Sequence, residues 1–119
     1  RSFKDELSEL PDQYKSSNEI TSVVNRMERV ENQNRDWDKF MAIFNEVHPD
    51  FHQRLRKKHP QLSSNDLRLS SLMRMNFTNK EMASILHISE AGLKKARYRL
   101  RKKMELESES DIAQYIFEV

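Results

Sequence analysis

The 119-residue sequence contains no cysteine, a single glycine and only three prolines. Without cysteine the chain forms neither disulfides nor thiolate metal sites, and its redox compartment cannot be inferred from cysteine usage. Few glycines and prolines mean few helix breakers, and alternating runs of β-branched residues are also missing. These absences predict an all-α protein.

Membrane spans and catalytic motifs are missing as well. No apolar run approaches the roughly 18–20 residues of a membrane span, and no signal peptide is visible. The sequence has no glycine-rich phosphate loop and no G-x-S-x-G motif. His48 and His52 are four residues apart, but Pro49 separates them and nothing completes a metal ligand set. We therefore predict no enzyme activity, cofactor or metal.

The charge is unevenly distributed along a chain whose net charge is only +2. Residues 1–62 are neutral overall, residues 63–104 carry +7 and residues 105–119 carry −5. A positive charge concentrated in one segment is typical of nucleic-acid-binding proteins. Apolar residues make up only 36% of the chain, which predicts a small core and exposed faces that need partners.

Most of the positive charge lies between Gly92 and Met104, where seven residues are Lys or Arg and none is acidic. At the helical period of about 100° per residue, the apolar side chains form one stripe: Leu93, Ala96, Leu100 and Met104. The opposite side carries Lys94, Lys95, Tyr98 and Lys102, with Arg97 and Arg101 on one flank and Arg99 and Lys103 on the other. Such a helix suits the DNA major groove, although the same pattern also fits a solvated basic face.

A second short helix is predicted just before the basic one. Thr78-Asn79-Lys80-Glu81 is a capping-box pattern. The apolar face that follows comprises Met82, Ala83, Ile85 and Leu86. His87-Ile88-Ser89 then forms a turn, and Ser89 is a good N-cap for the basic helix. The sequence therefore predicts two short helices joined by a tight turn.

This arrangement resembles the LuxR-type (GerE-type) helix-turn-helix from about residue 62 to residue 106. The family opening corresponds to LSSND at 62–66, its core to TNKEMASILHIS at 78–89, and its ending to RLRKKM at 99–104. Asn76 replaces the usual turn glycine, and Asn tolerates the left-handed conformation best after Gly. The stretch GLKKA at 92–96 lacks the usual Thr and His.

The resemblance implies sequence-specific binding of double-stranded DNA as the output domain of a bacterial transcriptional regulator, with residues 90–104 as recognition helix. By their faces, Lys94, Lys95 and Tyr98 would contact base edges. Lys80, Arg97, Arg101 and Lys102 would contact phosphates. A Trp- and Phe-rich helix before such a unit also resembles the C-terminal part of Bacteroides sensor-regulators. RNA polymerase is a further possible partner.

The N-terminal half is predicted to be helical. Residues 1–15 would be a linker or frayed helix, and residues 16–48 one long helix whose heptad positions pair in a dimer. Extra apolar residues at Val24, Phe40 and Val47 equally favour an amphipathic helix packed on its own domain. The residue pair His48-Pro49 ends it, and residues 49–61 form a short connecting helix with Phe51 and Leu55 inward.

Residues 62–119 are predicted to form a compact four-helix domain. Its first helix opens with a capping box at Ser63 and Asp66, and its last with another at Ser108 and Asp111. In the family this last helix commonly makes the dimer contact, but it equally suits a simple core-covering role. The candidate dimerisation residues are Ile20, Val23, Met27, Val30 and Asn34 in the long helix, with Ile112, Tyr115 and Ile116 in the last.

The chain starts with Arg rather than Met, so we expect it to be a fragment of a longer protein. That parent protein could be membrane-anchored, whereas this fragment is expected in the cytoplasm without membrane contact. The alternative function is a helical protein-interaction or dimerisation module, similar to a sigma factor, whose basic face meets an acidic protein. The salt dependence of binding separates the two hypotheses, because each neutralised phosphate steepens it.

Overall fold

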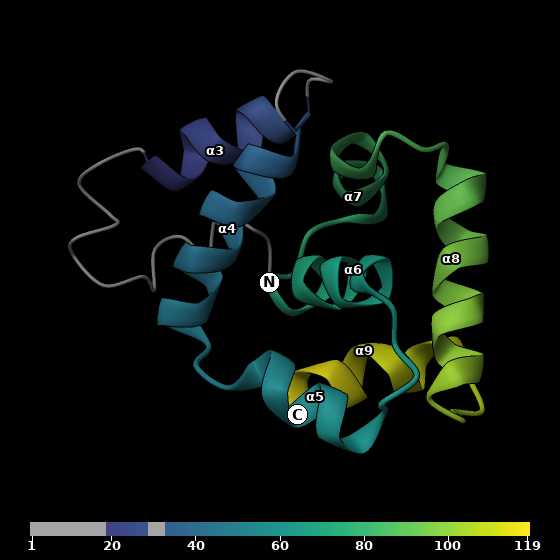
Figure 1. Cartoon of the computed structure of the whole chain (residues 1–119). Coiled ribbons are helices and arrows are strands. Elements are labelled where there is room, and N and C mark those ends of the chain that lie inside the picture. Colours follow the sequence, from purple (N-terminus) through teal and green to yellow (C-terminus); the bar gives the residue numbers. More distant parts are fainter. Residues whose placement is uncertain (1–18, 29–32) are drawn as a thin grey trace.

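The computed structural model describes residues 19–28 and 33–119, and every regular element in these ranges is an α-helix. The all-α prediction is therefore confirmed for the described residues (Figure 1). The helices are α3 (Glu19–Met27), α4 (Gln33–Val47), α5 (Phe51–Lys58), α6 (Ser64–Arg74), α7 (Asn79–Leu86), α8 (Glu90–Lys103) and α9 (Glu109–Glu118). The linker or frayed helix predicted for residues 1–15 lies outside the described residues.

The prediction of one long helix over residues 16–48 is wrong. Helix α3 ends at Met27, α4 begins at Gln33, and the two helices pack against each other. The Nε–H of Arg26 donates to Oδ1 of Asp36 at 3.0 Å between them. A heptad seam buries only two positions in seven, whereas these helices have wider apolar faces. Folding back buries Val24 and Phe40 within one chain, together with the heptad residues Val23, Met27, Trp37 and Phe44.

An aromatic cluster joins the N-terminal helix pair to the rest of the molecule. Trp37, Phe40 and Phe44 follow one face of α4 and are at most 3% exposed. The Phe40 ring lies 5.5 Å from Trp37 and 6.5 Å from Phe77, while Phe44 meets Phe51 at 5.4 Å between ring centroids. Because Phe51 opens α5 and Phe77 precedes α7, the described helices share one hydrophobic core.

The connection between α4 and α5 follows the sequence prediction closely. Helix α4 ends just before His48, and α5 buries Phe51 and Leu55, as expected. Asp50 precedes α5 in the left-handed conformation, with φ 67°. The Nε2–H of His52 donates to Oγ of Ser71 at 2.5 Å, because that hydroxyl itself donates to the Leu67 carbonyl. This bond fixes α5 against α6.

We expect His48 at this connection to make the stability of the chain sensitive to acid. Burial, and then the nearby Arg74 guanidinium, lower the pKa of His48 to about 4, and Nε2 of His48 has no hydrogen-bond partner among the described residues. The unfolded ring titrates near 6.5, so the unfolded chain binds more protons between these values and is favoured as pH falls. We expect the free energy of unfolding to drop by about 1–2 kcal/mol from pH 6.5 to 4, after allowing for solvent screening.

Urea unfolding at several pH values, for the wild type and His48→Leu, measures this loss. The variant should lose less stability over the same pH range, because it retains only the contributions of His52 and His59, whose pKa values are lowered by burial and by the neighbouring Arg56 and Lys58 respectively. Identical pH profiles for the two proteins would show that His48 does not contribute.

The four C-terminal helices begin mostly as predicted. Ser63 and Asp66 exchange side-chain and backbone hydrogen bonds of 3.2 and 2.9 Å in a capping box. Asn76 adopts φ 61°, which confirms the left-handed position expected there. Helix α9 begins after Ser108, but the predicted capping box does not form, since Ser108 makes no side-chain cap bond. Its backbone accepts a bond from the Asp111 N–H at 3.1 Å instead.

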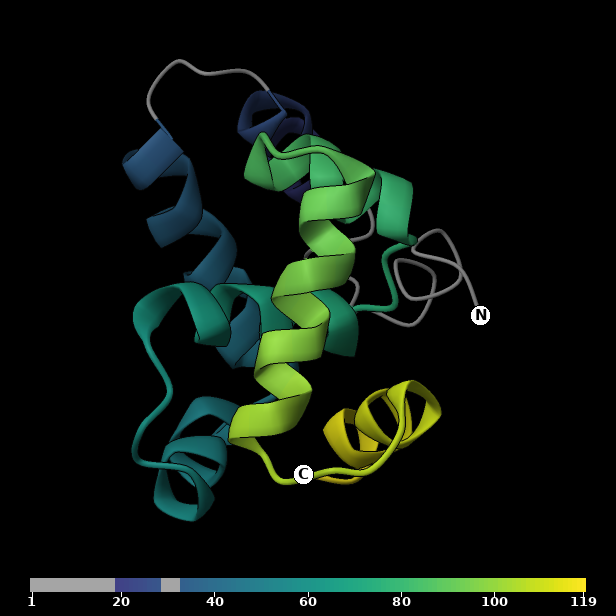
Figure 2. The ribbon, with the colours of Figure 1, turned by 90° about the vertical axis from the view of Figure 1, so that its right-hand side faces the viewer.

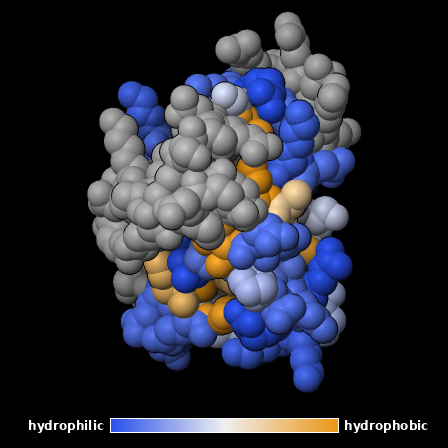
Figure 3. Space-filling view, turned by 90° about the vertical axis from the view of Figure 1, so that its left-hand side faces the viewer, coloured by the Kyte–Doolittle hydropathy of each residue, from blue (hydrophilic) through white to orange (hydrophobic). Residues whose placement is uncertain are grey.

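Helix α6 lies at the centre of the arrangement, with α7 and α9 on either side of it (Figure 1). Helix α8 occupies one edge of the molecule, and the α3–α4 pair occupies the opposite edge. On the face opposite α8, apolar side chains reach the surface in a broken strip between hydrophilic ones (Figure 3). Within the described ranges, none of the helices combines the length and apolar character needed to cross a membrane.

Candidate nucleic-acid interface

Local signals define both ends of α7. The Thr78 N–H donates to Oε1 of Glu81 at 2.8 Å, and the Glu81 N–H donates to Oγ1 of Thr78 at 3.1 Å. At the other end His87 adopts φ 57° and ψ 44°. This left-handed residue reverses the chain, and the Ile88 N–H then donates to the Ala83 carbonyl at 3.0 Å. The predicted three-residue turn is therefore present.

Helix α8 begins with Ser89 as its N-cap, whose Oγ accepts from the Gly92 N–H at 2.9 Å. A Cβ at position 92 would lie 3.2 Å from that oxygen, so glycine leaves room for the cap. The helix covers the predicted range to within one residue. Leu93 and Leu100 are fully buried, Met104 is 3% exposed and Ala96 is half-buried, which confirms the predicted apolar stripe.

The predicted base-contacting side chains all point to the surface. Helix α8 runs along the outer face of the molecule (Figure 2), and Lys94, Lys95 and Tyr98 are exposed. Tyr98 is 53% exposed, with the Arg101 guanidinium carbon 5.0 Å and the Lys102 Nζ 5.4 Å from its ring centroid. The outward face therefore combines three ammonium groups with an aromatic ring that is flanked by cations.

The residues predicted to contact phosphates fall into two groups. Lys80, near the start of α7, and Lys102 are exposed. Arg97 and Arg101 are half-buried and bonded within the chain. Arg97 Nη1 donates to Oδ1 of Asn79 at 2.6 Å, and Arg101 Nη1 donates to the Leu106 carbonyl at 2.7 Å. These two arginines join α8 to its neighbours, so their guanidinium groups are only partly available to a ligand.

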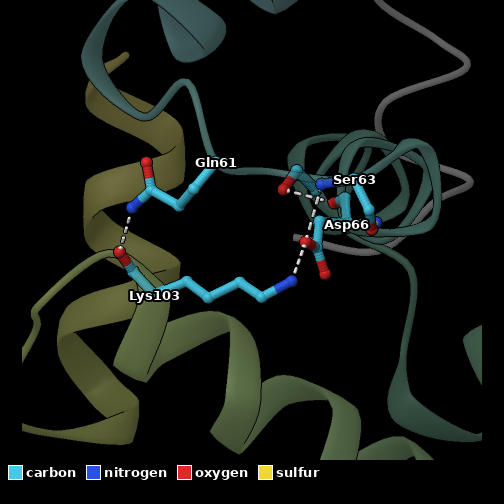
Figure 4. Close-up of polar contacts among 5 residues, drawn as sticks. Gln61, Ser63, Asp66 and Lys103 are labelled. Atoms are coloured by element: carbon cyan, nitrogen blue, oxygen red, sulfur yellow. Dashed lines mark hydrogen bonds and ion pairs between the residues drawn. The ribbon is translucent and has the colours of Figure 1, made fainter.

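A polar network at the C-terminal end of α8 was not foreseen from the sequence (Figure 4). Lys103 Nζ lies 2.6 Å from Oδ2 of Asp66, and the Lys103 carbonyl accepts from Nε2 of Gln61 at 2.7 Å. Partial burial would raise the pKa of Asp66, but hydrogen bonds from Lys103 and Ser63 outweigh it and lower that pKa. The network fixes the end of α8 against the start of α6.

A further contact connects the N-terminal helix pair to the turn before α8. Helix α3 packs on α7, and Nε2–H of His87 donates to the Met27 carbonyl at 2.9 Å. The sequence places His87 in the turn but contains no signal for this partner, which lies sixty residues away in the chain. The orientation of the turn therefore depends on the position of α3.

Most of the candidate dimerisation residues whose side chains the structure describes lie inside the chain. Tyr115 is half-buried, and its hydroxyl lies 2.6 Å from Nε2 of His59. The side chains of Ile20 and Asn34, and the whole of Val30, fall outside the described residues. The other four are at most 1% exposed: Val23, Met27, Ile112 and Ile116. These four contribute to the core of one chain rather than to a surface that a second copy could reach.

The site thus consists of an exposed basic helix that is held at both ends by internal bonds. In the described part of the chain, no group of three or more His, Asp or Glu side chains could hold a metal ion. No family model matches the sequence, and no curated protein or solved structure is significantly similar to it.

Proposed function

We propose that this protein binds double-stranded DNA, as the output domain of a bacterial transcriptional regulator of the LuxR type. Helix α8 would enter the major groove, and the α3–α4 pair would connect the DNA-binding unit to an upstream part of a longer protein. The observation that carries the proposal is the face of α8, where Lys94, Lys95, Tyr98 and Lys102 are all exposed.

The geometry of α7 and α8 supports this proposal. A major groove about 12 Å wide admits an α-helix, and α8 lies at one edge of the molecule (Figure 1), where its outward side chains are exposed. Lysine ammonium groups can donate to guanine O6 and N7, so Lys94 and Lys95 are suited to base contacts. Lys80 and Lys102 are suited to phosphates, with smaller contributions from Arg97 and Arg101 because of their internal bonds.

We further propose that the DNA-bound form is a dimer paired through the outer side of α9. Ile112 and Ile116 are buried, which leaves Ala113 and Phe117 as exposed apolar residues of that helix. Phe117 is 41% exposed, with the Arg74 guanidinium 4.7 Å from its ring centroid. A pair of such helices would bury Phe117 of both copies.

The test of DNA binding is fluorescence anisotropy with a random-sequence duplex across a salt series. The logarithm of the association constant should fall linearly with the logarithm of the salt concentration. About six phosphate contacts should give this log–log plot a slope of about −5. A folded protein that fails to bind duplex DNA at low salt would contradict the proposal. Such a result would favour the alternative, in which the basic face meets an acidic protein with a shallower salt dependence.

Lys95 and Lys102 should differ in their effect on specificity. Once a preferred duplex has been selected, Lys95→Ala is expected to lose about 1–3 kcal/mol of discrimination between that duplex and a random one. Lys102→Ala should weaken binding to both duplexes alike and reduce the salt slope by about one. Competition binding with the two duplexes measures both effects, and equal behaviour of the two variants would show that Lys95 makes no base contact.

A further inference from the structure

A groove beside the basic helix is not used by the proposed DNA contacts. It has a volume of about 260 Å³ and lies between the first turns of α4 and α6, the end of α7 and the middle of α8. Its apolar lining consists of Trp37, Leu69, Ile85, Leu86, Ile88 and Ala96, of which Leu86, Ile88 and Ala96 are half-buried or exposed and the other three are buried. Ile88 is 40% exposed, so part of this apolar lining is accessible to a partner.

The rim of the groove is positive. Arg68 and Arg99 both line it, and neither has a carboxylate partner among the described residues. The Arg68 guanidinium carbon lies 4.9 Å from the centroid of the Trp37 ring, which holds it at the edge of the apolar floor. Asp66 also lines the groove, but Lys103 and Ser63 already bond to its carboxylate.

We propose that this groove docks an acidic peptide segment of a partner protein through one bulky apolar side chain. The apolar floor would take the side chain, and the guanidinium groups of Arg68 and Arg99 would bind carboxylates on either side of it. The hollow is smaller than the roughly 300–1,000 Å³ of typical small-molecule sites. A phosphate backbone would gain nothing from the apolar lining, so DNA is the less suitable occupant.

The groove opens on one flank of α8 and leaves the outward face free. Ala96 and Arg99 contribute to it. At about 100° per residue, Lys94 and Tyr98 lie about 100° or more from Arg99 around the helix, with Lys95 and Lys102 between them and Arg99. A peptide in the groove would therefore sit beside bound DNA rather than replace it. This interaction does not depend on DNA binding, and each can fail without the other.

The probe for this site is a fluorescein-labelled peptide, Asp-Asp-Glu-Phe-Leu-Glu-Asp, titrated with the intact chain and followed by anisotropy. Ile88→Ser removes apolar lining, and Arg99→Glu reverses one charge of the rim. Lys94→Glu is the matched control, because it changes the net charge as Arg99→Glu does but on the outward face. A second peptide with Ser in place of Phe and Leu tests the need for the apolar side chain.

We expect peptide affinity to fall at least about tenfold in Ile88→Ser and in Arg99→Glu, and no more than about twofold in Lys94→Glu. Duplex DNA binding should show the reverse order, with Lys94→Glu impaired and Ile88→Ser unchanged. Circular dichroism confirms that each variant is folded, and Arg99→Glu keeps the test valid if Ile88→Ser does not fold.

Several results would overturn the proposal. One is failure of the wild type to bind the acidic peptide, and another is equally tight binding of the Ser-containing peptide. Equal losses in Arg99→Glu and Lys94→Glu would indicate unspecific attraction to the basic helix. Weaker DNA binding in Ile88→Ser would assign the groove to DNA. If the wild type sediments as a dimer and Ile88→Ser as a monomer, the groove would be assigned to a second copy of the chain.

Discussion

Replacing Lys94, Lys95 and Lys102 together by alanine is expected to weaken binding to random duplex DNA about 500-fold at 0.1 M salt. All three ammonium groups are exposed on the outward face of α8. If each releases counterions from one phosphate or from the groove, the log–log salt slope should become shallower by about 2.7. Fluorescence anisotropy across a salt series measures both the loss of affinity and the change of slope.

The matched control removes the same number of charges elsewhere. Lys39, Arg56 and Lys57 are exposed on α4 and α5, and their joint replacement by alanine changes the net charge equally. That control should lose much less affinity and keep most of its salt slope. Equal losses in the two triple variants would mean that only the net charge matters and that α8 is not the DNA surface.

Phe40→Ala is expected to destabilise the whole chain by roughly 3–5 kcal/mol. The Phe40 ring is completely buried and meets Trp37, Phe44 and Phe77. Because Phe77 precedes α7, the substitution leaves a cavity between the N-terminal helix pair and the C-terminal helices. The loss is a large part of the roughly 5–15 kcal/mol of a typical domain, and chemical denaturation followed by circular dichroism measures it.

Lys39→Ala provides the control, since Lys39 is exposed next to Phe40 on the same helix and should change stability by less than about 0.5 kcal/mol. Trp37 fluorescence and helical circular dichroism should report one common transition in the wild type, because the described helices share one core. Two separate transitions, with Phe40→Ala affecting only the first, would show that the N-terminal pair folds independently.

The signals that sequence analysis interpreted correctly are local ones. The capping boxes at Ser63 and Thr78 and the N-cap at Ser89 act within three residues, so their residue types are sufficient to locate helix starts. The Ser108 pattern shows the limit of such signals, because the same residue types there do not form the box. Asn76 adopts the left-handed conformation for a reason equally local, since its short side chain tolerates positive φ.

The longest predicted helix shows why periodicity alone is insufficient. Apolar residues at heptad spacing between positions 20 and 44 fit a helix that pairs with a second chain and a helix that folds back on itself. The choice depends on what else is available to cover the apolar faces. Here Phe77 and the other core side chains provide that cover, so the helix pair packs within its own chain.

The sequence by itself determined the composition of α8: its apolar stripe, its outward cations and its N-cap follow from the helical period and short-range chemistry. Only the tertiary structure decided which of those cations are free. Arg97 bonds to Asn79, Arg101 to the Leu106 carbonyl and Lys103 to Asp66, while Lys94, Lys95 and Lys102 remain on the surface. The reason is that a hydrogen bond to Asn79 or Asp66 depends on how α8 packs against α7 and α6, and that packing is set by the whole core.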